Sequence, residues 1–214
     1  MNKNTIVLLS GGLDSLVSVA LLREEYCITK ALHINYGQKP AKKEFEACEK
    51  ICKYYDLELE VLNLDWYAKI SSNSALSQSN SINNEEKSYW MPNRNGLFLN
   101  IAGSYADALN CQFIAIGANK EEAQTFSDNS VEFIDSVTKL FETSTRDNVK
   151  VIAPLINYNK NEIIKKALEL NTPIEHVWSC YDNQEKHCGS CPSCNFLKTA
   201  LIQNNKKDLL EKLF

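Results

Sequence analysis

The sequence has few of the features that mark membrane, exported or nucleic-acid-binding proteins. No run of about 18 apolar residues is present, so we expect no membrane-spanning helix. Residues 1–5 lead directly into a short apolar run without a small-residue cleavage site, so we expect no signal peptide and a cytoplasmic protein. The net charge of −4 argues against a broad basic surface, and we therefore expect no direct nucleic-acid partner.

Glycine and proline are also scarce, with seven and five among 214 residues. Apolar residues make up 44% of the chain, which is enough to bury a sizeable core in one domain with a small appendage. Lysines gather in two short stretches, which we predict to be solvated helix faces. They are Lys39, Lys42 and Lys43 in the first stretch and Lys160, Lys165 and Lys166 in the second.

Strand-like and helix-like apolar patterns alternate along the chain. The predicted strands are 5–10, 28–35, 57–64, 112–117 and 149–155. The predicted helices are 14–25, 41–56, 95–110, 130–145 and 159–171. This alternation predicts βαβ units, and so an α/β fold with a Rossmann-like parallel sheet covered by helices on both faces.

Residues 71–90 interrupt this alternation with a stretch rich in serine and asparagine. The stretch is too long for an ordinary connection between two elements. We predict either a lid over a functional site or a disordered loop.

The stretch LLSGGLDSLVSVALL breaks an apolar run with Ser10-Gly11-Gly12 and Asp14-Ser15. It follows the first predicted strand, and in an open parallel sheet ligands bind beyond the carboxyl ends of the strands. Glycines let backbone N–H groups approach an anion, and a helix start adds positive charge. The stretch therefore predicts a phosphate site. The alternative is a tight turn in which Asp14 or Ser15 caps the helix.

Four of the eight cysteines lie within fifteen residues, at Cys180, Cys188, Cys191 and Cys194. Without a secretory signal, this spacing indicates metal ligation rather than disulfides. Four thiolates complete the closed ligand shell of a structural zinc site, although His187 is a competing candidate ligand. An iron–sulfur cluster is the alternative to zinc. We predict an α/β domain over residues 1–175 and a zinc-binding lobe with a helix over 176–214.

These motifs resemble those of a known family. SGGLDS resembles the pyrophosphate loop of the ATP pyrophosphatases, which adenylate a substrate and release pyrophosphate. With NYGQ after the second strand, PNRN before a helix and WSCY…CGSCPSC near the end, the chain resembles the 7-cyano-7-deazaguanine synthase (QueC) family over nearly its whole length. The resemblance implies a HUP-type Rossmann-like domain, ATP, Mg²⁺, a structural Zn²⁺ held by the four cysteines, and a homodimer.

The family adenylates 7-carboxy-7-deazaguanine, lets ammonia displace AMP to give an amide, and dehydrates the amide to a nitrile with further ATP. A carboxylate needs this activation because its own leaving group would be oxide. The loop and Mg²⁺ can stabilise the departing pyrophosphate. The resemblance thus implies an ATP-dependent C–N ligase that acts on small molecules.

The resemblance also assigns site residues. Those expected at ATP are Leu8, Leu9, Ser10, Gly11, Gly12, Leu13, Asp14, Ser15, Leu16, Val17 and Ser18. Those expected at the deazaguanine are Tyr36, Gln38, Arg94, Asn95, Asp128, Glu132 and Phe133. We expect Ser10, Asp14, Ser15 and Arg94 to act in catalysis. Arg94 would hold a carboxylate or phosphate through its bidentate fork, or else form a surface ion pair. Asp14 would either cap the helix or hold Mg²⁺.

Residues 122–133, EAQTFSDNSVEF, depart from the family pattern DYSGYPDCRPEF that is associated with deazaguanine recognition. This leaves open a relative that joins the activated deazaguanine to another amine, such as that of a protein in an antiviral system. A non-catalytic nucleotide-binding module with a zinc lobe is an alternative of another class. The acidic charge disfavours a tRNA-modifying pyrophosphatase.

Overall fold

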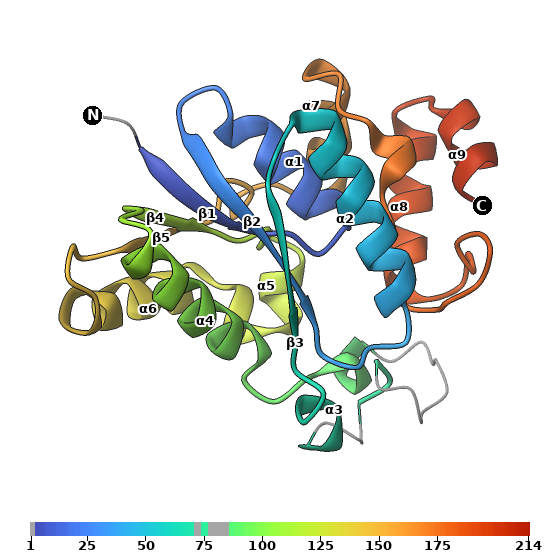
Figure 1. The fold of residues 1–214 in the computed structure, drawn as a ribbon. Helices are drawn as coiled ribbons and strands as arrows, with labels where there is room; N and C mark the ends of the chain where they lie inside the picture. The colour runs from blue at the N-terminus through green and yellow to red at the C-terminus, as the bar shows by residue number, and fades with distance from the viewer. Residues whose placement is uncertain (1–2, 71–73, 77–85) are drawn as a thin grey trace.

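The computed structural model describes residues 3–70, 74–76 and 86–214. Five strands form one parallel sheet in the order β3-β2-β1-β4-β5 (Figure 1). The strands are β1 (Asn4–Leu8), β2 (Cys27–Asn35), β3 (Leu59–Asn63), β4 (Phe113–Ala115) and β5 (Lys150–Ile152). The predicted Rossmann-like α/β sheet is confirmed, with β1 as its central strand.

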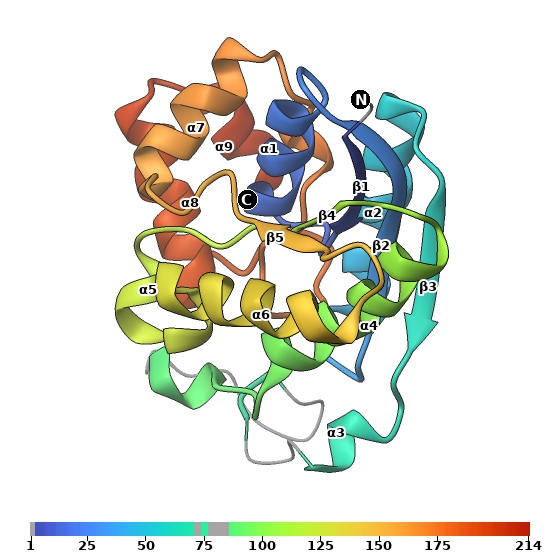
Figure 2. The same cartoon turned by 90° about the vertical axis from the view of Figure 1, so that its left-hand side faces the viewer.

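Helices cover both faces of the sheet (Figure 2). One face carries α1 (Leu13–Leu22), α2 (Ala41–Tyr55), α7 (Lys160–Glu169) and α8 (Pro192–Gln203). The other face carries α4 (Arg94–Ala108) and α6 (Val131–Ser144). The shorter helices are α3 (Tyr67–Ile70), α5 (Glu122–Thr125), α9 (Lys207–Leu213) and the 3₁₀ turns η1 (Glu86–Tyr89), η2 (Ser127–Asn129) and η3 (Ile174–His176).

The residues at the end of β1 contribute alternately to two hydrophobic clusters, one on each face of the sheet. Ile6 and Leu8 belong to the cluster under α4 and α6, whereas Val7 and Leu9 belong to the cluster under α1 and α7. Successive side chains of a strand point to opposite faces, so a central strand covered on both sides needs an unbroken apolar run. This explains the run IVLL that leads into the glycine pair.

The predicted elements agree closely with the observed ones up to residue 171. Beyond it the sequence predicted only a lobe with a helix, whereas the structure has η3, α8 and α9. Leu197 and Leu201 of α8 are buried in the same cluster as α1 and α7. The division at residue 175 stays a prediction.

Residues 71–73 and 77–85 of the serine- and asparagine-rich stretch lie outside the described residues, so its assignment as a lid or a disordered loop stays a prediction. In the described remainder, Ala75 N–H donates to the Ser88 carbonyl at 2.8 Å, and Leu76 and Tyr89 are buried against the α4 face.

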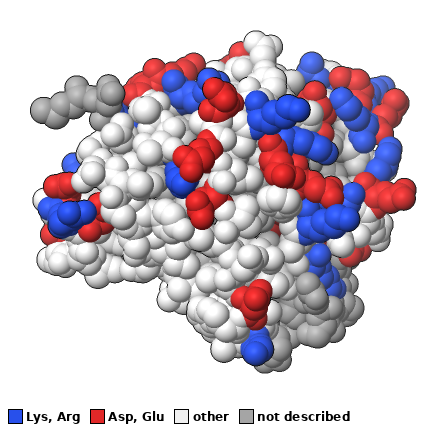
Figure 3. All heavy atoms as spheres, in the orientation of Figure 1, with Lys and Arg blue, Asp and Glu red and all other residues white. Residues whose placement is uncertain are grey.

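No helix within the described ranges is both long and apolar enough to cross a bilayer. Figure 3 shows basic and acidic side chains interleaved over the upper and right-hand part of one face, and a largely uncharged surface at its lower left.

Candidate active site

A cavity opens at the carboxyl ends of β1, β2 and β4, where the loops after these strands meet α1, α4, α7 and the cysteine-rich segment. Its lining includes most of the predicted ATP loop, namely Leu8, Leu9, Ser10, Gly12, Leu13, Asp14 and Ser15. The position is the one that the parallel topology favours for ligands.

The loop between β1 and α1 is tightly constrained. Gly11 has a φ of +83°, and a Cβ atom there would lie 2.5 Å from the Glu44 carbonyl oxygen. The Gly11 carbonyl accepts a hydrogen bond from the Trp178 N–H at 2.8 Å. Only glycine fits this backbone and this close approach.

The capping alternative for Asp14 and Ser15 is wrong. Gly12 is the N-cap of α1, and neither Asp14 nor Ser15 supplies a capping side chain. The Ser15 hydroxyl donates to the Gly12 carbonyl at 3.0 Å, and Ser10 Oγ lies 3.1 Å from Ser15 Oγ. The start of α1 therefore keeps backbone N–H groups and two hydroxyls at the cavity, which suits an anion.

Asp14 pairs with a lysine that the sequence placed on a solvated face. Lys160 Nζ lies 2.6 Å from Asp14 Oδ2 and 3.6 Å from Glu122 Oε1, and its side chain is only 10% exposed. The prediction of a solvated Lys160 is wrong because α7 begins at the cavity edge and directs this side chain inward. Lys165 and Lys166 are partly or fully exposed on the same helix.

Burial and charge shift the pKa of both partners. Burial raises the pKa of Asp14, although Lys160 lowers it. Burial alone would lower the pKa of Lys160, but the carboxylates of Asp14 and Glu122 raise it. Asp14 Oδ1 is buried without a hydrogen-bond partner among the described residues. A carboxylate oxygen that has no hydrogen-bond partner and lies near the carboxylate of Glu122 is suited to coordinate a divalent cation such as Mg²⁺.

Arg94 begins α4 on the opposite side of the cavity. Its Nε donates to Asn95 Oδ1 at 3.3 Å, and its Nη1 donates to the Tyr36 hydroxyl at 3.5 Å. None of the ion pairs among the described residues involves Arg94. Arg94 lies on the cavity wall, which favours the interaction with a carboxylate or phosphate over the surface ion pair. Burial would lower the pKa of Arg94, but Tyr36 and Asp128 raise it, so the guanidinium stays charged and available to an anion.

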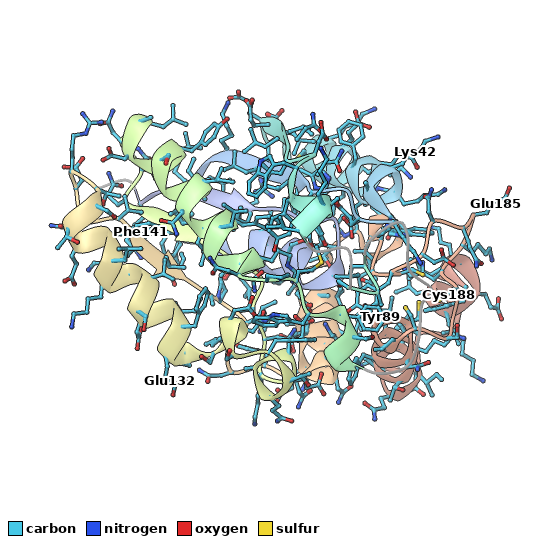
Figure 4. The ribbon with its side chains drawn as sticks, turned by 90° about the horizontal axis from the view of Figure 1, so that it is seen from below. Lys42, Tyr89, Glu132, Phe141, Glu185 and Cys188 are labelled. Atoms are coloured by element: carbon cyan, nitrogen blue, oxygen red, sulfur yellow. The ribbon has the colours of Figure 1, made fainter. Side chains whose placement is uncertain are left out.

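The segment 122–133 brings a different set of residues to the cavities from the one that the sequence predicted. Asp128 lines a smaller side pocket next to Arg94, and Asn95 Nδ2 donates to the Asp128 carbonyl at 3.0 Å. Figure 4 shows Glu132 pointing outward from α6, and the residue is exposed. Phe133 packs against the cluster under α4 and α6. The structure thus brings Asp128 to the site but leaves Glu132 and Phe133 outside both cavities.

The remaining predicted residues take different positions. Tyr36 and Asn95 line the main cavity, while Gln38 is 1% exposed and does not. Val17 and Leu16 of α1 are buried in the core, and Ser18 Oγ is buried without a partner among the described residues. The sequence missed several cavity residues, including Glu44, Glu122 and Tyr181.

The four predicted metal ligands converge. The sulfur atoms of Cys180, Cys188, Cys191 and Cys194 all lie within 4.8 Å of one another. Three backbone N–H groups donate to these sulfurs. Those of Asp182 and Cys188 donate to Cys180 Sγ at 3.3 Å, and that of Cys191 donates to Cys188 Sγ at 3.4 Å. Convergent thiolates with N–H donors fit a tetrahedral Zn²⁺.

His187 is not part of this ligand set. Its Nδ1 lies 3.2 Å from the Leu213 carbonyl, and its Nε2 accepts from the Ser179 N–H at 3.1 Å. Because Nε2 accepts a hydrogen bond, Nδ1 carries the proton of the neutral ring. Burial lowers the pKa of His187 to about 4, so the ring is neutral and ties the cysteine segment to the C-terminus.

The cysteine segment forms part of the cavity wall. Trp178, Ser179 and Tyr181 line the cavity, and Ser179 Oγ accepts from the Leu13 N–H at 3.3 Å. Together with the Trp178–Gly11 hydrogen bond, this contact joins the cysteine cluster directly to the glycine loop.

Similar proteins were found in sequence and in structure. The family model described as "Queuosine biosynthesis protein QueC" matches residues 4–205. The 7-cyano-7-deazaguanine synthase of Methanosarcina barkeri is 39% identical over 226 residues, covering 97% of this chain and 98% of the relative. The enzyme of the same name from Methanobrevibacter smithii is 41% identical over 222 residues and covers 97% of each chain.

Solved structures share the fold at low identity. NMN synthetase from Francisella tularensis has a TM-score of 0.53 at 16% identity, covering 99% of this chain and 82% of its own. A 4-thiouridine synthetase in complex with RNA and bound ATP has a TM-score of 0.53 at 20% identity, covering 99% of this chain and 53% of its own. The match of the family model and the identity to full-length relatives show that the chain belongs to the QueC family of ATP-dependent queuosine biosynthesis enzymes.

Proposed function

We propose that this chain converts 7-carboxy-7-deazaguanine into 7-cyano-7-deazaguanine, with ATP as the activating substrate and ammonia as the source of nitrogen. The observation that carries the proposal is that the glycine loop and the guanidinium of Arg94, which has no ion-pair partner among the described residues, line one cavity. This arrangement suits a reaction in which the α-phosphate of ATP meets a carboxylate. The names of the relatives support the same reaction.

The loop is the proposed site of the pyrophosphate group of ATP. Backbone N–H groups at the start of α1 and the hydroxyls of Ser10 and Ser15 are donors for phosphate oxygens. Lys160 adds a buried positive charge to the same wall. Asp14 and Glu122 would hold Mg²⁺, which offsets the charge of a departing pyrophosphate when it is bound.

Arg94 is the proposed site of the substrate carboxylate. A guanidinium can donate two parallel hydrogen bonds to a carboxylate and so fix its orientation. A carboxylate oxygen held there attacks the α-phosphorus, pyrophosphate leaves, and an acyl adenylate forms. Ammonia then attacks the acyl carbon, and AMP departs with the carboxylate oxygen. The oxygen of the resulting amide attacks the α-phosphorus of a second ATP, and pyrophosphate leaves. The nitrogen then loses its two protons as AMP departs with that oxygen, which gives the nitrile.

The side pocket next to Arg94 is the proposed site of the deazaguanine ring. Trp90 and Phe126 line it with nearly parallel rings whose centroids are 6.2 Å apart. The Asp128 carboxyl accepts a hydrogen bond from Asn129 Nδ2 at 3.1 Å through Oδ1. Its other oxygen is an acceptor for N–H groups of the base. Aromatic side chains combined with a few placed polar groups are typical of a pocket that binds a base.

A structural Zn²⁺ held by the four cysteines would keep Trp178 and Ser179 against the loop. An all-cysteine shell has no open position, so this metal would stabilise the cavity wall and would not touch the substrate.

The test is to supply zinc-loaded protein with Mg-ATP, 7-carboxy-7-deazaguanine and ammonium labelled with heavy nitrogen. We expect labelled 7-cyano-7-deazaguanine, AMP and pyrophosphate by mass spectrometry. Arg94→Gln should lose this activity, whereas the matched control Arg146→Gln should keep it. Arg146 is exposed and pairs with Asp107 at 3.4 Å, away from the cavity.

Two outcomes would contradict the proposal. Binding of ATP without any pyrophosphate release in the presence of the carboxylate would indicate a non-catalytic module. A mass shift on a co-purified protein, with the labelled ammonium left unused, would indicate that the activated carboxylate is joined to another amine.

A further inference from the structure

Glu44 is a cavity residue to which the proposed reaction assigns no role. It lies in the first turns of α2, and its side chain lines the main cavity together with Tyr36 and Arg94. No cation forms an ion pair with it among the described residues. An acidic group on a cavity wall without a cationic partner is a candidate for binding a ligand or moving a proton.

The side chain of Glu44 is held in one orientation by Gln38. Gln38 Nε2 donates to Glu44 Oε2 at 2.6 Å, and Gln38 Oε1 accepts from the Tyr36 N–H at 2.9 Å. Gln38 itself is 1% exposed. The residue that the sequence assigned to the substrate is therefore a buried support that fixes the carboxyl of Glu44.

The second oxygen of this carboxyl has no protein hydrogen bond in the described part of the chain. The backbone of Glu44 is part of α2, and its carbonyl oxygen packs closely against Gly11 of the glycine loop. A carboxyl oxygen held beside the pyrophosphate loop, without a partner of its own, is suited to bind a small cationic donor.

The charge environment favours proton transfer at this position. Burial raises the pKa of Glu44 to about 7, while the hydrogen bond from Gln38 and the charge of Arg94 on α4 lower it. Tyr36, which directly follows β2, and Cys48 on α2 also interact with this group, and burial keeps both neutral by raising their pKa. A carboxyl that titrates near neutral pH can take up and release a proton during turnover.

We propose that Glu44 binds the ammonium ion and removes one of its protons, so that neutral ammonia attacks the acyl adenylate. The inference rests on the proposed function and adds a site for its second substrate. Ammonium gives one proton to the Glu44 carboxylate and becomes ammonia. The nitrogen of ammonia forms a C–N bond with the acyl carbon as the bond from that carbon to the AMP oxygen breaks. One further proton moves from the nitrogen to the departing phosphate, which leaves the amide and AMP.

The test compares Glu44→Gln with Glu49→Gln, an exposed control on the same helix. Glutamine keeps the size and an acceptor oxygen but cannot take the proton. Carboxylate-dependent exchange of pyrophosphate into ATP reports adenylation alone, and amide formation from ammonium reports the second step. Hydroxylamine is a third arm, because it is largely unprotonated near neutral pH and needs no base before it attacks.

We expect Glu44→Gln to keep pyrophosphate exchange and hydroxamate formation near the level of Glu49→Gln. Amide formation from ammonium should fall about a hundredfold or more, the usual contribution of a general base. This defect should shrink as the pH rises and free ammonia becomes abundant.

Three results would overturn the inference. Unchanged amide formation in Glu44→Gln would show that no base is needed there. A loss of pyrophosphate exchange or hydroxamate formation as large as the loss of amide formation would also overturn it. Such a result would show that Glu44 binds the purine-like ring of a substrate or supports the fold. Absence of pyrophosphate exchange in the unaltered protein would instead overturn the proposed function itself, and this inference with it.

Discussion

Replacement of Lys160 by methionine should destabilise the protein far more than removal of an exposed lysine from the same helix. Lys160 and Asp14 are joined at 2.6 Å, with side chains only 10% and 16% exposed. Breaking a buried pair leaves one charge without compensation and costs about 3–5 kcal/mol. Each kcal/mol lowers the Tm of a domain of this length by roughly 2–4 °C, so we expect a fall of roughly 6–20 °C.

The matched control is Lys166→Met on the same helix. Lys166 and Glu169 are also 2.6 Å apart, but their side chains are 30% and 47% exposed. Water and salt screen such a pair, and its loss should cost less than about 1 kcal/mol. The two variants therefore separate the effect of burial from the effect of distance.

The loss in Lys160→Met should also depend on pH. Burial already holds the pKa of Asp14 above 3.8, and removal of Lys160 raises it further. A carboxyl with a higher pKa in the folded state binds its proton more tightly there, so stability rises as the pH falls toward that pKa. The Tm difference between Lys160→Met and the unaltered protein should thus narrow from about pH 8 to about pH 5.

Thermal unfolding followed by circular dichroism measures both effects. A Tm for Lys160→Met close to that of Lys166→Met would refute the claim that the buried pair supports the fold. A difference that stays constant across this pH range would refute the assignment of the cost to an ionised Asp14.

Three other variants test separate parts of the account. Arg94→Lys should raise the KM for the deazaguanine carboxylate about tenfold, because lysine loses the bidentate fork, and an unchanged KM in steady-state kinetics would contradict this. Cys188→Ser should lower the zinc content measured by mass spectrometry, and it should also lower pyrophosphate exchange because the cysteine segment forms part of the cavity wall. Full metal content with full activity would count against this role. Asn159→Ala should cost about 1 kcal/mol in denaturant unfolding because it removes the capping box of α7, and no measurable change would argue against that cap.

Much of the fold could be predicted because it depends on local patterns. The alternation of β-branched runs with helical spacing is a property of short windows, and it located each strand of the sheet in the described part of the chain. The glycine pair and the cysteine spacing were equally local, since a loop with positive φ needs glycine and a metal shell needs nearby ligands. These features appear in the structure where the sequence placed them.

The polar wall of the cavity could not be predicted in the same way. Asp14 and Lys160 are 146 residues apart, and nothing in either local stretch indicates that they pair. One signal was present, because Asn159 and Glu162 form a capping box that starts α7 just beyond β5. A helix start after a parallel strand lies at the ligand-binding edge, which would have directed Lys160 to the site.

Motif matches also failed to show which side chains reach the cavity. Glu132 matches the family pattern but lies on the exposed side of α6, whereas Asp128 from the same motif is buried beside Arg94. Gln38 matches as well, yet it acts on Glu44 from beneath the cavity surface. The direction of a side chain depends on where each short helix begins, and residue spacing alone leaves this open.

The central claim is that the carboxylate is activated by adenylation in the cavity between the glycine loop and Arg94. The most direct measurement uses 7-carboxy-7-deazaguanine whose carboxylate carries isotopically labelled oxygen, supplied with Mg-ATP and ammonium. We predict that one labelled oxygen appears in AMP, because the bond from the acyl carbon to the phosphate oxygen breaks when ammonia attacks. Label found in inorganic phosphate, or AMP formed without label, would contradict adenylation of the carboxylate.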